Sequence, residues 1–158
     1  MRNLLLFFAF FSLLDLSSGS DVAIGDAFIV SLPDTAKKQT RSAQPTSIPD
    51  TILDKFSDAS FQLSIYRWPQ VNADVPLKQV PEQWTQNKEW ASASDISEGR
   101  TDSGIPYVTF KTRIVRDERR PYDSEMTVLR SSTGEAYMFQ MTGDTKTIDA
   151  VRKSIKRN

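Results

Sequence analysis

The sequence predicts an α+β domain in which helices pack on an antiparallel sheet. Three observations lead to this fold class. Apolar and polar residues alternate in several separate segments, the later segments follow one another through short turns, and an amphipathic helical pattern closes the chain. Strands with one helix before and one helix after an antiparallel meander are typical of α+β domains.

The first half of the chain predicts two strands and a long loop. Ala27 to Leu32 alternates in hydrophobicity and ends at Pro33, which is typical of a strand. The polar segment Asp34 to Asp50 contains two prolines and no apolar period, so we expect a loop there. Ser60 to Trp68 alternates again and predicts a half-buried strand that Pro69 ends.

A helix is predicted over Pro81 to Ala93, because this stretch holds good helix formers and starts with a proline at a plausible first helical position. Its apolar stripe is weak. Trp84 and Trp90 are six residues apart and cannot lie on one line of a helix. We expect one indole in the core and the other at an edge.

The second half predicts a meander closed by a helix. Turn residues at Asp102 to Gly104 and Ser131 to Gly134 separate alternating segments. Capping residues Gly143 to Thr145 precede an apolar helical spacing that includes Ile148 and Val151. The predicted strands are Ser94 to Thr101, Pro106 to Val115, Tyr122 to Arg130 and Glu135 to Thr142.

The chain begins with the pattern of a secretory signal peptide. A short basic start precedes the apolar run Leu4 to Leu14, which is too short to cross about 30 Å of hydrocarbon. Small residues allow cleavage after Gly19 or Ser20. We expect residues 1–19 to be removed and residues 20–158 to form one domain, exported to a periplasm or secreted. With no cysteine for a lipid, we expect no membrane anchor.

Composition excludes several function classes. The 20 cationic and 20 anionic residues balance, which gives no electrostatic footprint for nucleic acid or an anionic membrane. Without histidine or cysteine, the usual acid–base, nucleophilic and zinc chemistries are absent. We therefore expect neither enzyme activity nor a cofactor. A carboxylate enzyme stays open, using Asp117 or Glu118 with Asp123 or Glu125, but such pairs arise by chance in charged strands and we expect a solvated turn here.

The candidate partner-binding site is the charged tip, Arg116 to Pro121, together with the start of the strand that follows it. This tip joins the second and third predicted strands of the meander. Arginine and tyrosine are enriched at protein interfaces, and loops on a rigid sheet are where binding sites are placed. The alternative is that these charges are solvated and protect the hairpin from edge-to-edge aggregation. The candidate residues are Arg116, Arg119, Arg120 and Tyr122.

The order of elements resembles the PsbP-like/Mog-type/DcrB superfamily over most of the mature chain. The likeness rests on Phe28 to Pro33, the helix with Trp84, the strand entry Gly104 to Tyr107, and the closing unit from Glu135 through Asp144 and the last helix. The resemblance implies an antiparallel sheet covered by helices. It also implies a non-catalytic role as an assembly factor, adaptor or chaperone, and it carries over no functional residue.

Two functions follow from these observations. The first is an exported accessory protein that binds another protein through the tip, as an adaptor, an assembly factor or an inhibitor of the immunity type. The alternative is a carrier of a small ligand or lipid, because aromatic residues could line an apolar cavity. The cavity residues of that alternative are Trp84, Trp90, Phe110 and Phe139.

Overall fold

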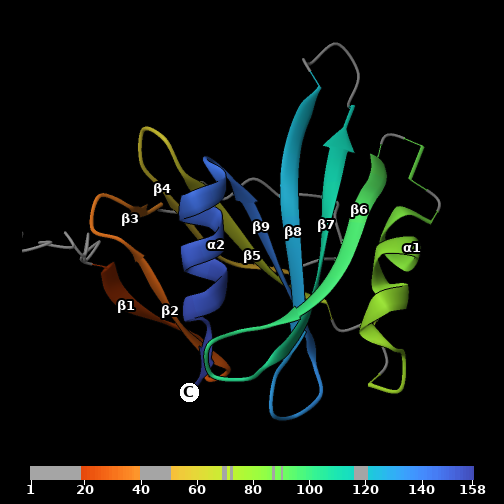
Figure 1. The fold of residues 1–158 in the computed structure, drawn as a ribbon, viewed down its shortest axis with the longest axis horizontal. Helices are drawn as coiled ribbons and strands as arrows, with labels where there is room; N and C mark the ends of the chain where they lie inside the picture. Colours follow the sequence, from red (N-terminus) through yellow and green to blue (C-terminus); the bar gives the residue numbers. More distant parts are fainter. Residues whose placement is uncertain are drawn as a thin grey trace, which may run out of the picture.

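The computed structural model describes residues 19–39, 51–68, 71, 73–86, 88–89, 91–115 and 121–158. In these residues two antiparallel sheets and two helices form the α+β fold that the sequence predicts (Figure 1). The predicted signal peptide, except for Gly19, lies outside this part of the chain. None of the helices described there is long and apolar enough to cross a membrane.

The smaller sheet has three strands, with β2 (Phe28–Pro33) in the middle. On one side of it lies β1 (Gly19–Ile24), which the sequence did not predict, and on the other side lies β10 (Lys156–Arg157) from the end of the chain. The N–H of Asn158 donates to the carbonyl oxygen of Ala27 at 3.2 Å, which ties the C-terminus to this sheet.

The larger sheet has seven antiparallel strands and contains the predicted meander. The described residues also form two α-helices. They are α1 (Val80–Thr85), which follows the 3-10 turn η1 (Leu77–Gln79), and α2 (Thr145–Ser154). The strands are, in spatial order, β3 (Lys37–Lys38), β4 (Thr51–Ser57), β5 (Gln62–Trp68), β9 (Ala136–Thr142), β8 (Tyr122–Arg130), β7 (Pro106–Ile114) and β6 (Ala91–Arg100).

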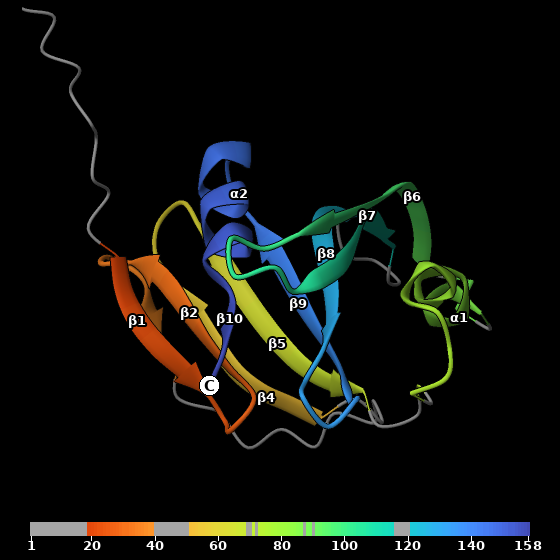
Figure 2. The ribbon, with the colours of Figure 1, turned by 60° about the horizontal axis from the view of Figure 1, so that its bottom comes forward.

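Each face of the larger sheet has its own apolar core, since successive side chains of a strand point to opposite faces. Ile65 and its cross-strand partner Phe139 belong to the core under α2 and the small sheet, here called the α2 core. Val128 and its partner Met138 belong to the core under α1, the α1 core. In both views α1 lies beside β6, at the end of the molecule away from β1 and β2 (Figures 1 and 2).

The helix predicted over Pro81 to Ala93 is too long. It ends at Thr85, and Ala91 already begins β6. Pairing with β7 overrides the helix preference of the alanines, because Ala91 lies opposite Ile114 and Ala93 opposite Thr112. The predicted loop from residue 34 contains the short strand β3, and residues 40–50 of it lie outside the described residues.

Two turns of the meander share one structure. Arg100 to Gly104 joins β6 to β7, and Arg130 to Gly134 joins β8 to β9. In each turn the arginine Nη1 donates to the carbonyl oxygen of the glycine, at 2.9 Å in the first and 2.7 Å in the second. The glycines have φ of 81° and 85°, a region that favours glycine and explains the predicted turn positions.

Both turns also hold a neighbouring element in place. In the first turn the N–H of Asp102 donates to Lys153 O at 3.0 Å and Ser103 Oγ donates to Ile155 O at 2.9 Å, so the turn satisfies carbonyls at the end of α2. In the second turn Arg130 Nη2 donates to Val75 O at 2.6 Å and fixes the chain before η1.

A buried arginine fastens α2 to the sheet. Arg152 is only 8% exposed, and its Nη2 donates to the Glu125 carboxylate of β8. Its Nη1 donates to Asp149 at 2.8 Å and its Nε to Thr127 Oγ1 at 3.2 Å, while the guanidinium carbon lies 5.7 Å from the centre of the Tyr107 ring. A buried charge of this kind is tolerated only when its hydrogen bonds are satisfied.

Replacing Arg152 by methionine should destabilise the fold by about 3 to 5 kcal/mol, because the Glu125 carboxylate, whose side chain is only 19% exposed, then loses its cationic partner. Changing Glu125 to methionine as well removes the uncompensated charge and should restore most of the lost stability. Urea unfolding of the parent, the single variant and the double variant measures both effects. A double variant that is no more stable than the single one contradicts this account.

Asp58 caps the turn between β4 and β5. Its carboxylate accepts the Thr35 hydroxyl at 2.5 Å and the N–H groups of Ser60 and Phe61 at 2.7 and 2.8 Å. The hydrogen bond from Thr35, followed by those from the two N–H groups, lowers the pKa of Asp58 from 3.8 to about 2. The ionised form is therefore favoured by folding.

A group with a lowered pKa contributes stability above its unfolded value and loses that contribution as the pH falls. For Asp58 the window runs from about pH 4 down to about pH 2. We predict that Asp58→Asn, which cannot titrate, lowers the acid dependence of Tm in this window. Asp102→Asn, at an exposed turn, is the control. If Tm falls equally steeply with decreasing pH in the parent and in Asp58→Asn, the prediction is wrong.

Candidate functional site

The described part of the predicted tip is the end of the β7–β8 hairpin, namely residues 113–115 and 122–123, here called the hairpin end. Ile114 pairs with Tyr122 and Arg113 pairs with Asp123 across the two strands. In Figure 1 this end of β8 projects beyond both helices. The hairpin end therefore offers surface that neither helix covers.

Exposed apolar side chains concentrate at the hairpin end. Val115 is 48% and Tyr122 is 47% exposed, and in the described part of the chain only Ile96 is another large hydrophobic residue of this kind. Ile114, between Arg113 and Val115, is 3% exposed and belongs to the α1 core. Val115 directly follows β7, and it continues the alternation of that strand: Val115 is outside and its neighbour Ile114 is buried.

The charged pair at the hairpin end is loose. Arg113 Nη1 lies 3.6 Å from Asp123 Oδ1, and both side chains are largely exposed. Ion pairs of this kind contribute about 0 to 1 kcal/mol. The guanidinium of Arg113 can therefore exchange Asp123 for a carboxylate of a partner at little cost.

A row of hydrogen bonds crosses the sheet just inside the hairpin end. The Tyr66 hydroxyl donates to Gln140 Oε1 at 2.9 Å, and Gln140 Nε2 donates to Ser124 Oγ at 2.9 Å. Ser124 Oγ lies 2.8 Å from Thr112 Oγ1. The row links β5, β9, β8 and β7. The strand β8, which carries Tyr122, and the strand β7, which ends one residue before Val115, are therefore held in a fixed register.

Of the predicted partner-binding residues, Tyr122 lies in the described part of the chain and is exposed. Arg116, Arg119 and Arg120 lie outside it. Arg113 and Asp123 are recognisable in the sequence as charges at the tip, but neither their pairing nor the place of Val115 on the same surface was predicted. Val115 ends an alternating segment, so its outward direction was a signal that the sequence did contain.

The residues predicted for an apolar cavity fall into both cores. Trp84 and Phe110 contact each other in the α1 core, with ring centroids 6.0 Å apart. Phe139 is in the α2 core and packs against Phe28, with centroids also 6.0 Å apart. Trp90 lies outside the described residues. The sheet separates Phe139 from Trp84 and Phe110, so these three side chains do not line one space.

The carboxylates considered for catalysis are engaged with cations. Glu125 pairs with Arg152 and Asp123 with Arg113, whereas Asp117 and Glu118 lie outside the described residues. Within the described ranges no group of three or more acidic residues could hold a metal ion. These contacts give Glu125 a structural role at the base of α2.

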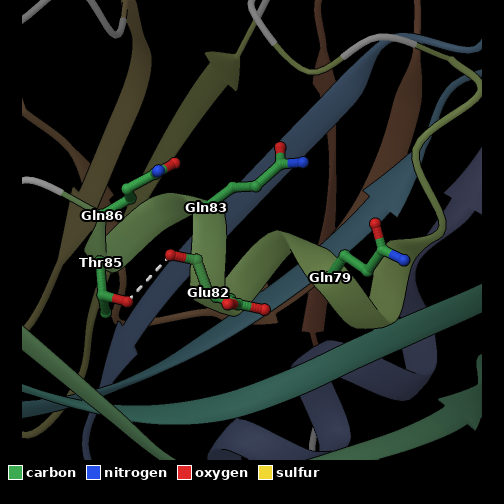
Figure 3. Close-up of a pocket in the computed structure, with 5 residues that line it drawn as sticks. All are labelled: Gln79, Glu82, Gln83, Thr85 and Gln86. Atoms are coloured by element: carbon green, nitrogen blue, oxygen red, sulfur yellow. Dashed lines mark hydrogen bonds between the residues drawn. The ribbon is translucent and has the colours of Figure 1, made fainter.

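A polar hollow of about 410 Å³ lies along α1 (Figure 3). Thr85 Oγ1, one of its groups, donates to Glu82 O at 3.0 Å. The hollow is lined by amide, carboxylate and hydroxyl side chains and not by the apolar ones that a lipid carrier needs. Its lining residues are Gln79, Glu82, Gln83, Thr85 and Gln86.

The structure is similar to the solution structure of cyanobacterial PsbP (CyanoP) from Synechocystis sp. PCC 6803. The TM-score is 0.57 at 15% sequence identity, and the match covers 92% of this chain and 95% of that one. No protein-family model and no curated protein matches the sequence. The comparison confirms a PsbP-like fold, which the order of elements predicted.

Tyr122→Ala should change stability by no more than about 0.5 kcal/mol, because the ring is half exposed at a strand end. Its cross-strand partner provides the contrast: Ile114→Ala should cost about 2 to 5 kcal/mol, since it opens a cavity in the α1 core. Thermal unfolding of both variants tests the assignment. A large loss for Tyr122→Ala means that the ring belongs to the core.

Proposed function

We propose that the chain is an exported, non-catalytic accessory protein that holds a protein partner through the hairpin end. The observation that carries this proposal is the joint exposure of Val115 and Tyr122 at the end of a sheet whose two faces each pack in an apolar core. An accessory role is also what the PsbP-like resemblance implies.

The chemistry of the hairpin end suggests the kind of partner surface. Val115 and the Tyr122 ring offer apolar area, and the Tyr122 hydroxyl and Arg113 offer hydrogen-bond donors. In the sequence, Arg116, Arg119 and Arg120 add three cations next to them. A partner with carboxylates around an apolar patch complements this set, because desolvated arginine and tyrosine side chains supply much of the binding energy at interfaces.

The packing of the sheet supports a binding role because it fixes the hairpin end before a partner arrives. Side chains of β7 and β8 are buried in both cores, and the hydrogen-bond row from Tyr66 to Thr112 holds the strands in register. A surface that is rigid before binding loses less conformational entropy when the complex forms.

A carrier function gains less support. Its predicted residues Trp84, Phe110 and Phe139 are packed in two cores, and the hollow along α1 is polar. An adaptor, an assembly factor and an inhibitor would all use the same contact. The identity of the bound protein decides among these three roles.

The test is affinity capture with the immobilised mature chain from Ser20, using envelope and medium extracts of its own host. We expect one protein to be retained by the parent and lost with Tyr122→Ala and with the triple variant Arg116→Ala, Arg119→Ala, Arg120→Ala.

A matched control removes three other exposed cations, Lys146, Lys153 and Arg157, each changed to alanine. This control should retain the protein, because it has the same net charge as the triple variant and an intact hairpin end. If the parent retains no protein, or if the control loses it equally, the proposal is wrong. Native mass spectrometry for a co-purifying small ligand then tests the carrier.

A further inference from the structure

A second candidate surface lies at the edge of the larger sheet, away from the hairpin end. The strand order places β6 at this edge, and α1 packs beside its first residues, where Ala91 and Ala93 are partly buried against the α1 core. From Asp95 to Arg100 every residue except Gly99 is exposed. The second half of β6 is thus an uncovered strand edge.

A β-bulge separates the two halves of β6. The register with β7 shifts between Ser94 and Ser97, and Asp95 has a positive φ of 52°. Its carboxylate pairs with Lys111 Nζ at 2.8 Å. Bulges bend and twist a strand, so the exposed half runs away from α1. The bulge limits any edge pairing to residues 96–100.

The direction of the backbone groups in this half follows from the turn. The N–H of Thr101 donates to Ile105 O at 3.0 Å, so the backbone groups of Thr101 point toward β7. In an antiparallel ladder, hydrogen-bonded residues alternate with residues that are not bonded to that neighbour. The backbone N–H and C=O groups of Gly99 therefore also point toward β7. The N–H and C=O groups of Glu98 and Arg100 then point outward.

The side chains on this edge are complementary to themselves. Glu98 and Arg100 are exposed, carry opposite charges and lie on either side of Gly99. Suppose that a second copy of β6 pairs antiparallel with the first, with Gly99 opposite Gly99. The Glu98 of each copy then lies opposite the Arg100 of the other copy, which gives two pairs of opposite charge. A register centred on Glu98 or on Arg100 places like charges opposite each other, which disfavours it.

We propose that two copies of this protein associate through residues 96–100 of β6, centred on Gly99, so that the two larger sheets become continuous. The outward groups of Glu98 and Arg100 exchange backbone hydrogen bonds with the other copy, and the two Glu98–Arg100 pairs fix the register. Since the β6 strands run antiparallel, the two hairpin ends point in opposite directions. This contact is independent of the proposed partner site.

Sedimentation equilibrium of the purified protein over a range of concentrations tests the dimer. Glu98→Arg should weaken association about tenfold or more, because it turns two attractive pairs into repulsive ones. Combining Glu98→Arg with Arg100→Glu restores the complementarity and should recover association. Circular dichroism of the double variant checks that the turn still folds without the hydrogen bond from Arg100 to Gly104 O. Glu82→Arg makes the same charge change on the exposed side of α1 and should have no effect.

Glu98→Pro provides a second test, which acts on the backbone of the edge strand and leaves Arg100 unchanged. Proline is tolerated where the N–H of an edge strand faces solvent, but it removes the outward donor that the second copy needs. We expect a folded monomer by circular dichroism and sedimentation. A parent that is monomeric at millimolar concentration overturns the proposal, and so does a dimer that both Glu98→Arg and Glu98→Pro leave intact.

Discussion

The structure depends on burial of both faces of the seven-stranded sheet. The chain has no cysteine, so no disulfide stabilises it and side-chain packing must do so. One face packs against α2 and the small sheet, and the other against η1 and α1. The central strands β5, β9, β8 and β7 therefore place alternate residues in different cores. In the described residues, the hairpin end and the second half of β6 are two places that these layers leave uncovered, and a partner can reach the sheet there.

The same constraint explains which elements could be predicted from the sequence. Tyr122–Arg130 was predicted with its observed bounds, because a charged tip precedes this segment and turn residues follow it. β4 was missed because a bulge between Ile52 and Asp54 breaks its alternation. β1 was missed because Gly19, Ser20 and Asp21 have low strand preference, and its formation depends on pairing with β2. The sequence shows alternation within one strand but not the partner that a polar strand will find.

The candidate site, like the fold, could be predicted from the sequence only in part. Tyr122 could be recognised in the sequence as an aromatic residue beside a charged tip, and it is 47% exposed. Its role in binding stays a prediction. Other features depend on contacts between distant residues, so one sequence could not show them. Arg152 lies on the helix that the sequence predicts at the end of the chain, but its partner Glu125 lies on the strand β8. The hydrogen-bond row joins Tyr66 to Thr112 through two intervening strands and likewise leaves no local pattern.

The central claim is that the hairpin end touches a protein partner, and photo-crosslinking tests it most directly. A photoreactive phenylalanine analogue replaces Tyr122 in one protein and Gln83, on α1, in another, and both are illuminated in host extract. The account predicts one crosslinked protein from position 122 and none of that mass from position 83. Equal crosslinking from both positions, or a specific product from position 83 alone, would contradict the assignment of the hairpin end as the contact surface.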